Sequence, residues 1–532
     1  MNTAIQPLDA LIVLAYLAAL AGVGVYFSRR QTNLDEFFLA RQSMAWLPVG
    51  LSLMAALNSG IDYLMQPAST IRYGLILLVG TSSWLFLYPW VSRVTLPFYR
   101  RLNTYTAYEF LEARFDVRVR TLAAGIFIGW RLGWMATAIY VPCLAINAAT
   151  GGRVDLTTMI VVLGVLVTIY TMLGGIQAVI WNDVMQFCIM FGGLAATVWI
   201  ALTHVPGGLG EIWTAAEQAG KTSLATPMTL AADAGLVDHV RAFFTQPINV
   251  TSILFAIVVG RMAGYTCDQV MVQRFQTTKS LKDSRQAFVV NAAGDALWMF
   301  GLSLVGLALL AYFNHHALPP EFSSDKIVPY FMSVAFPAGA VGLVIAAILA
   351  ASLSSIDSAI NSCTSVVIVD FYNRLVLGRQ TGHATGGDER RQVLVSRVAT
   401  VLFGLSGTLL ATNVSRIGTL LEIANKLINA FTGPLFGIYL FAMFSRRATS
   451  GPVLVAGIAG TLTSYYVAYR TSIGFMWPST FGLAATLLVG GALSVLLRTR
   501  ASAQTQKLTW WEVTRAVAAA SPSQASLGAA AR

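Results

Sequence analysis

Charged residues, cysteine and histidine are all scarce in this chain. Only 11% of its 532 residues are charged, which excludes an ordinary soluble protein. The four cysteines stand singly, so no disulfide framework is expected. Two of the five histidines, His315 and His316, are adjacent in the sequence. No carboxylate motif surrounds them, which argues against a metal centre there. The net charge of +11 comes without basic patches interleaved with aromatic residues, so we expect no binding of nucleic acid.

Long hydrophobic runs fill most of the sequence, and 56% of its residues are hydrophobic. About 20 apolar residues are needed to cross the hydrocarbon layer of a bilayer. About 13 runs approach that length, which predicts an all-α polytopic membrane protein with little chain left for soluble domains. The expected spans are residues 8–28, 45–66, 74–98, 122–149, 156–173, 176–203, 248–267, 288–312, 338–369, 393–412, 420–444, 452–469 and 475–497.

Lysine and arginine gather in alternate connections between these spans. The long connection from His204 to Arg241 is poor in both, whereas the connections after the first, third and seventh spans are basic. The positive-inside rule therefore places the N-terminus outside and the C-terminus in the cytoplasm of a multi-pass protein of the cell (inner) membrane. The basic residues counted after the third and seventh spans are Arg100, Arg101, Arg114, Arg118, Arg120, Arg274, Lys279, Lys282 and Arg285.

Polar residues interrupt the second predicted span. The residues that break its apolar pattern near mid-membrane are Asn58, Ser59, Gly60 and Asp62. Non-helical backbone at that depth is tolerated where it lines a cavity, and it frees carbonyl groups for an ion or a solute, so we predict an unwound helix here. The seventh span, five spans later, is similarly interrupted over residues 259–265, which indicates two five-helix halves in an inverted repeat.

A polar stripe runs through the span over residues 338–369. At helical spacing Ala351, Ser354, Ser355 and Ser358 share one face, so hydroxyl and carbonyl oxygens converge there and suit a small hard cation. An ionisable residue in a bilayer, such as Asp357, is expensive and is by default functional. The alternative for the serines is that they only hydrogen-bond backbone carbonyls one turn back.

Three ordered motifs identify a resemblance. They are GGIQAVIWNDVMQ over residues 174–186, DQVMVQR over residues 268–274, and AASLSSIDSAINS over residues 350–362, followed by Asp370, Phe371 and Tyr372. Together they resemble the signatures of the sodium/solute symporter family, which includes sodium/glucose, sialic acid and proline symporters. The resemblance covers most of the chain and implies a LeuT-like 5+5 inverted-repeat transporter fold, with one extra helix before the first repeat and two after the second.

This resemblance implies a division of the chain into six parts. An extra transmembrane helix with a cytoplasmic loop comes first, then the first five-helix repeat, an extracellular loop, the second five-helix repeat, two C-terminal transmembrane helices and a cytoplasmic tail. The expected boundaries are residues 1–44, 45–205, 206–243, 244–447, 448–499 and 500–532.

The resemblance also implies positions for Na⁺. The main site takes the backbone carbonyls of Ala55, Asn58 and Ala351 together with the hydroxyls of Ser354 and Ser355. Some relatives hold a second sodium ion, and the matching positions here are Asp183, Ser354, Asp357 and Ser358. Because Asp357 stands where a hydroxyl residue is usual, its carboxylate either strengthens the second site or carries a proton instead.

Buried polar side chains outside the ion positions are the candidates for contact with the solute. They are Ser59, Asp62, Thr81, Ser82, Arg131, Arg261, Asp295 and Asn425. Arg131 is similar in place to an arginine that clamps a carboxylate in relatives, and a guanidinium matches a carboxylate with two hydrogen bonds. The alternative is that Arg131 pairs with a carboxylate of the protein. Asp62 and Asp295 depart from the residues of sugar-carrying relatives, which weakens a simple neutral-sugar assignment.

These observations predict a sodium-coupled secondary active symporter that imports a small polar solute by alternating access. The favoured solutes carry a carboxylate: a sugar acid such as sialic acid, an amino acid or a monocarboxylate. The chain is expected to act as a monomer in the lipid bilayer. Proton coupling through Asp357 or Asp183 and neutral-sugar transport are the alternatives within this fold. No catalytic pair such as His-Glu-x-x-His is present, so we expect no enzyme.

Overall fold

Helices make up almost all of the structure. The computed structural model describes residues 6–28, 39–102, 104–171, 176–225, 235–316, 318, 323–378 and 389–520. Within these ranges the extended pairing consists of one isolated bridge between Met44 and Thr278. The predicted all-α class is therefore confirmed.

The helices are numbered in chain order, and short 3₁₀ or π segments are labelled η. The first part of the chain forms α1 (Pro7–Ser28), η1 (Ala40–Gln42), α3 (Trp46–Leu57), α4 (Gly60–Tyr73), η2 (Gly74–Ser83), α5 (Trp84–Trp90), η3 (Val91–Thr95), α6 (Leu96–Leu102), α7 (Glu109–Arg114), α8 (Val117–Ala149), α9 (Leu156–Thr171), α10 (Ile176–His204), α11 (Gly208–Gln218) and α12 (Leu236–Thr245). The rest forms α13 (Val250–Cys267), α14 (Gln269–Gln276), α15 (Leu281–His315), η4 (Ser324–Lys326), α16 (Ile327–Ala335), α17 (Ala340–Val366), η5 (Val367–Val376), α18 (Glu389–Ala411), η6 (Val414–Arg416), α19 (Leu420–Ile423), η7 (Ala424–Ile428), η8 (Asn429–Phe431), α20 (Thr432–Phe444), α21 (Ser450–Arg470), α22 (Pro478–Leu496), α23 (Ala503–Gln506) and α24 (Trp510–Ala520).

Many of these helices have the length and composition of membrane spans. In the part of the chain that the structure describes, ten helices are long and apolar enough to cross a bilayer, and three shorter apolar helices accompany them, at Pro7–Val23, Trp46–Leu57 and Leu156–Ile169. A multi-pass membrane protein is therefore confirmed. The expected number of about 13 spans is not confirmed, because residues 60–102 form one continuous helical stretch across two of the predicted spans.

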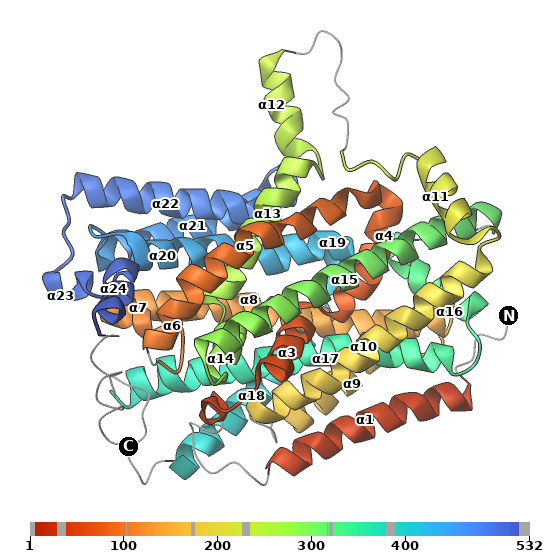
Figure 1. Cartoon of the computed structure of the whole chain (residues 1–532), viewed down its shortest axis with the longest axis horizontal. Helices are drawn as coiled ribbons and strands as arrows, with labels where there is room; N and C mark the ends of the chain where they lie inside the picture. Colours follow the sequence, from red (N-terminus) through yellow and green to blue (C-terminus); the bar gives the residue numbers. More distant parts are fainter. Residues whose placement is uncertain are drawn as a thin grey trace, which may run out of the picture.

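The six-part division of the chain and the orientation of its ends stay predictions. Residues 226–234 of the expected extracellular loop and residues 521–532 of the expected tail lie outside the described residues, as do the two glycines that begin the 174–186 motif. Within the loop, α12 stands out from the helix bundle (Figure 1).

The serine-bearing helix α17 lies at the centre of the bundle. Almost every residue from Gly342 to Val366 is buried, and the helix packs against α1, α8 and α10. Helix α15 packs against both α3 and α4. Figure 1 shows α20, α21 and α22 together along one flank of the bundle and α1 along the other. A polar stripe at the centre of α17 therefore faces protein, not lipid.

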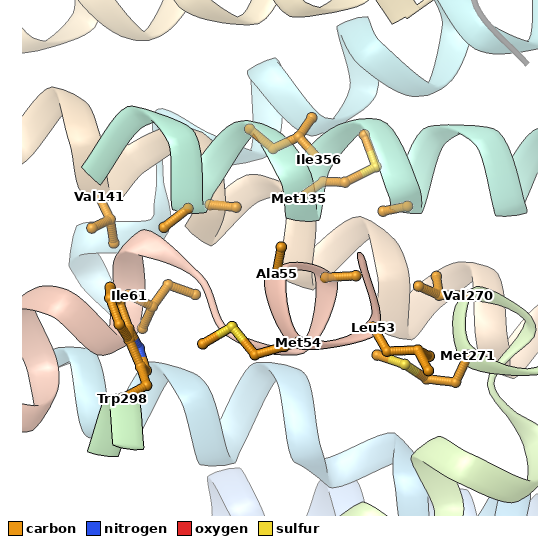
Figure 2. Close-up of a cluster of buried hydrophobic side chains, with 14 of the residues drawn as sticks. Leu53, Met54, Ala55, Ile61, Met135, Val141, Val270, Met271, Trp298 and Ile356 are labelled. Carbon is orange, nitrogen blue, oxygen red and sulfur yellow. The ribbon is translucent and has the colours of Figure 1, made fainter. Parts of the chain in front are cut away.

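The predicted unwinding of the second span is confirmed. Helix α3 ends at Leu57, and the next two residues, Asn58 and Ser59, have extended backbone angles. Helix α4 then starts with a capping box, in which the backbone N–H of Ser59 donates to the Asp62 carboxylate at 2.7 Å and Ile61 donates to the Ser59 hydroxyl at 3.2 Å. Figure 2 shows apolar side chains of α3 and α4 on either side of this link, between α17 and Trp298 of α15. The break is thus held by packing and by caps.

The predicted interruption of the seventh span at residues 259–265 is wrong. Helix α13 runs without a break to Cys267, because isolated glycines are tolerated inside a packed helix. The chain breaks one residue later, at Asp268, which has extended backbone angles and whose carboxylate accepts a hydrogen bond from Val270 at 2.9 Å to cap α14. Two broken helices, α3–α4 and α13–α14, therefore exist as predicted, but the second break is set by a capping aspartate.

Three arginines that the sequence places in basic connections are buried instead. Arg114, Arg120 and Arg274 are each at most 2% exposed. Arg114 donates to the carbonyl of Ala442 at 3.1 Å, and Arg120 pairs with Asp370 at 2.6 Å. These three side chains therefore lie inside the protein and not in solvent-exposed connections.

Gly60 allows the start of α4 to lie directly against α17. A Cβ atom at this position would overlap the Ser352 hydroxyl and would lie 2.9 Å from the carbonyl oxygen of Ile348. We expect Gly60→Ala to lower the free energy of unfolding by about 1–3 kcal/mol, because the two helices must separate. The measurement is thermal unfolding of the purified protein in detergent. Gly125→Ala in α8, where a Cβ atom meets nothing within 4 Å, is the control. Equal unfolding temperatures for the two variants would contradict this prediction.

Candidate ion and solute sites

Oxygen atoms of α3 and α17 converge at the end of α3. The Ser354 hydroxyl donates to the carbonyl of Ala55 at 2.8 Å and lies 2.9 Å from the carbonyl of Ala351. The Ser355 hydroxyl is 3.3 Å from the same Ala351 carbonyl. All four residues are at most 1% exposed. Asn58 follows directly after the helical end of α3, with its side-chain nitrogen 3.2 Å from the Met54 carbonyl. Four of the five predicted main-site residues, Ala55, Ala351, Ser354 and Ser355, therefore meet at one buried point made of neutral oxygen atoms. Asn58 lies three residues after Ala55 along the chain.

A second buried cluster joins α3, α10, α14 and α17 through Arg274. Its guanidinium pairs with Asp183 at 2.8 Å, donates to the Ser52 hydroxyl at 2.8 Å and also bonds to the Ser358 hydroxyl. Ser52 in turn donates to Asp183 at 2.5 Å. The predicted second-site residues Asp183 and Ser358 thus share one guanidinium. Arg274 itself was missed as a site residue, although the 268–274 motif contains it.

Asp357 adds a second carboxylate to the Arg274 cluster. Asp357 is 1% exposed, and its Oδ1 atom lies 3.5 Å from the Ser358 hydroxyl. The Oδ2 atom of Asp357 and the Oδ1 atom of Asp183 are buried with no hydrogen-bond partner among the described residues. One guanidinium faces two carboxylates, so the cluster keeps acceptor oxygens for a further cation.

A cavity of about 220 Å³ lies beside the break between α3 and α4. Residues 56–59 line it, directly after Ala55. Ser82 does not line it: this residue is exposed and its hydroxyl donates to the Val79 carbonyl at 2.6 Å. The other seven predicted solute-contact residues line the cavity: Ser59, Asp62, Thr81, Arg131, Arg261, Asp295 and Asn425. The predicted sodium-site residues and the cavity are therefore adjacent along α3, and Asn58 belongs to both sets.

Arg131 is held by the protein at the wall of this cavity. Its guanidinium forms an ion pair with Asp268, the residue that breaks the α13–α14 helix, and both side chains are at most 3% exposed. It also lies over the rings of Trp130 and Trp134, 4.7 and 5.1 Å from the ring centres. The alternative of an internal partner is thus observed for Arg131. Asp268 and Trp130 were missed, because nothing in the sequence pattern shows which carboxylate an arginine meets.

Arg261 is held in the same way on another wall. It pairs with Asp295 at 2.6 Å, donates to the Ser83 hydroxyl at 3.0 Å and lies 4.3 Å from the centre of the Trp84 ring. The Trp84 indole nitrogen donates to the same Asp295 carboxylate at 2.8 Å. Ser83, and not the predicted Ser82, is therefore the serine of this segment that supports the cavity wall.

Comparison with known proteins identifies the family. The family model of the sodium:solute symporters matches residues 37–460, most of the chain. The chain belongs to the sodium:solute symporter family. A sodium/sialic acid symporter, SiaT of Proteus mirabilis, is 30% identical over 483 residues, which cover 90% of this chain and 93% of that one. The sodium-dependent multivitamin transporter of Oryctolagus cuniculus is 29% identical and is covered over 75% of its length.

A solved structure of this family agrees with the fold. It shows a Na⁺-coupled sialic acid symporter in a substrate-bound, outward-open state, and it superimposes on 93% of this chain with a TM-score of 0.81 and 27% sequence identity. The resemblance to the symporter family and its LeuT-like fold are thereby confirmed. As a sodium:solute symporter, the chain is a multi-pass membrane protein that couples the movement of a small polar solute to Na⁺.

Proposed function

We propose that this symporter imports its solute by alternating access, with Na⁺ at the end of α3 and the solute in the adjacent cavity. The observation that carries this proposal is the 2.8 Å contact between the Ser354 hydroxyl and the Ala55 carbonyl. It joins α17 to the broken helix one residue before the cavity wall begins. Sodium bound by Ala55, Asn58, Ala351, Ser354 and Ser355 therefore holds the break in the shape that the solute meets.

The main site suits a transported ion because its ligands are neutral. Carbonyl and hydroxyl oxygens satisfy a small cation without a fixed counter-charge, so the ion is released when the two helices part. Sodium and solute then raise each other's affinity by the same factor, because coupling free energy is reciprocal.

A second sodium ion at Asp183, Ser354, Asp357 and Ser358 is part of the proposal. Arg274 already bonds to two of these residues, which leaves the free oxygens of Asp183 and Asp357 as the available ligands. The surplus carboxylate also supports the alternative of proton coupling at Asp357 or Asp183. Asp357→Ser, which restores the hydroxyl usual at this position in the family, distinguishes sodium binding from proton coupling. If the Asp357 carboxylate holds sodium, the variant keeps sodium-driven uptake. If the carboxylate carries a proton, the variant loses the uptake that a pH gradient drives.

The solute is proposed to be a small acid: a sugar acid such as sialic acid, an amino acid or a monocarboxylate. Sodium/sialic acid symporters and sodium-coupled monocarboxylate transporters are among the relatives, at 26–30% identity. Two arginines also line the cavity wall, and because each pairs with an aspartate of the protein, they bind a solute carboxylate only where that pair opens or shares its donors. We further propose that the chain acts as a monomer, that it is no enzyme, and that it lies in the cell (inner) membrane with its N-terminus outside.

Exchange of sodium for potassium at fixed pH tests the proposal. Purified protein in liposomes is given radiolabelled N-acetylneuraminate, pyruvate or an amino-acid mixture as probes. We expect uptake of at least one probe in an inward sodium gradient and none in an equal potassium gradient. Sodium chloride alone is also expected to raise the thermal unfolding temperature above that in potassium chloride, because the ion binds only the folded protein. Uptake that follows a pH gradient equally in both salts would favour proton coupling.

A further inference from the structure

The charges that line the cavity do not balance. The charged residues among those that the structure places on its wall are two arginines and three aspartates: Arg131, Arg261, Asp62, Asp268 and Asp295. Each arginine already has its own aspartate, in the pairs Arg131 with Asp268 and Arg261 with Asp295. A formal charge of minus one is left, and it belongs to Asp62.

Asp62 has a structural role that does not need this charge. Its Oδ2 atom accepts the backbone N–H of Ser59 in the capping box at 2.7 Å. A neutral acceptor such as asparagine fulfils a similar role at this position of a helix. Among the described residues Asp62 has no ion-pair partner, although it lines the cavity. The protein therefore keeps a carboxylate at the cavity wall with nothing of opposite charge bound to it.

Asp295 at the same cavity wall has a buried acceptor without a donor in the described part of the chain. Its Oδ2 atom binds Arg261 and Trp84, but its Oδ1 atom is buried without a hydrogen-bond partner among the described residues. Asp295 is only 1% exposed. A buried carboxylate oxygen left without a donor is costly, so Asp295 is stabilised if a donor of the solute reaches this oxygen when the side chains around it shift.

Two tryptophans elsewhere at the wall, Trp130 and Trp134, have buried indole N–H donors without a partner among the described residues. Each can donate one hydrogen bond to a carboxylate without adding a charge. The arginine between them, Arg131, is neutralised by Asp268. Met65, Met271, Met299 and Met476 supply apolar contact for the body of the solute.

We infer that the solute carries a protonated amino group, which binds Asp62 and the free oxygen of Asp295. The transported solutes are then amino acids and related zwitterions, and not simple carboxylate anions. An ammonium group offers three donors and one positive charge, which matches two acceptor carboxylates and the surplus charge of the cavity. A sugar acid or monocarboxylate without a free amine brings a second negative charge to Asp62 and is disfavoured. This inference rests on the proposed function, because it assumes that the solute occupies the cavity beside the sodium ligands.

Matched compounds that differ in the amino group test the inference. Thermal unfolding of the whole chain in sodium chloride is measured with a panel of all common amino acids. For L-leucine and L-phenylalanine the panel also contains the 2-hydroxy analogues and the amines that lack the carboxylate. N-acetylneuraminate and pyruvate are added as acids without a free amine. We expect at least one amino acid to raise the unfolding temperature, and its hydroxy analogue to bind about tenfold more weakly or worse, the equivalent of about 1.4 kcal/mol. A panel in which no amino compound binds, or in which the hydroxy acid or N-acetylneuraminate binds as well, overturns it.

Asp62→Asn isolates the charge, because asparagine keeps an acceptor for Ser59. This variant is expected to lose at least about tenfold in affinity for the amino acid found above while keeping its stabilisation by sodium. Asp238→Asn is the matched control: Asp238 caps α12 in the same way, with the N–H of Gly235 at 3.1 Å, and lies outside the cavity lining. Unchanged binding in Asp62→Asn overturns the inference. If instead sodium fails to stabilise even the unmodified protein, the proposed function fails, and this is seen before any solute is added.

Discussion

The double variant Ser354→Ala/Ser355→Ala is expected to need a far higher sodium concentration for uptake than the unmodified protein. Both hydroxyls lie within 3.3 Å of the Ala351 carbonyl, and Ser354 also reaches Ala55 on α3 at 2.8 Å. Loss of two neutral ligands leaves sodium with backbone carbonyls alone. At about 1.4 kcal/mol for each ligand, the sodium concentration for half-maximal uptake rises about 100-fold. The measurement is the sodium dependence of uptake in liposomes, with the thermal shift by sodium chloride as a second readout.

Ser365→Ala is the matched control for this pair. Ser365 is a buried serine of the same helix, and among the described residues its hydroxyl donates to the Ser362 carbonyl, one turn back, at 2.8 Å. It represents the alternative in which membrane serines merely satisfy their own helix. We expect its sodium response to equal that of the unmodified protein. A double variant at 354 and 355 that also kept the full response would place the main sodium site elsewhere.

Arg274→Met is expected to destabilise the folded protein more than Gly60→Ala does. The guanidinium is fully buried and is the partner of Asp183, with Asp357 close by. Its removal leaves buried carboxylates without a counter-charge, and breaking a buried pair in this way costs about 3–5 kcal/mol. The expected result is a much lower unfolding temperature or little folded protein, measured by size-exclusion chromatography and thermal unfolding in detergent.

Two variants separate the charge from the shape of the Arg274 side chain. Arg118→Met removes an arginine of equal size whose pair with Asp116 is at the surface, with the Arg118 side chain 70% exposed, and such pairs contribute about 0–1 kcal/mol. We expect it to fold normally. Asp183→Asn combined with Arg274→Met removes one of the unpaired charges and should regain part of the lost stability. Equal unfolding temperatures for Arg274→Met and Arg118→Met would show that the cluster is not held by charge.

Local patterns in the sequence were sufficient to predict the features that depend only on residues close together along the chain. The scarcity of charge and the apolar runs determine a multi-pass helical protein, since each long run must be buried in lipid or protein. The run of polar residues at Asn58 and Ser59 determines the break in the second span. Helical spacing determines that Ser354 and Ser355 share a face of α17 with the Ala351 carbonyl. Helix periodicity and capping are local, so these features follow without knowledge of the packing.

Only the tertiary structure decided which charged groups meet. Arg274 and Asp183 are 91 residues apart and Arg131 and Asp268 are 137 apart, and each arginine has several carboxylates that it could reach by sequence alone. The position of the second break, at Asp268 and not at the glycines before it, depends likewise on what the side chain caps and pairs with. Ion pairing is set by distances of a few ångströms between helices, and such distances are fixed by packing and not by the order of residues.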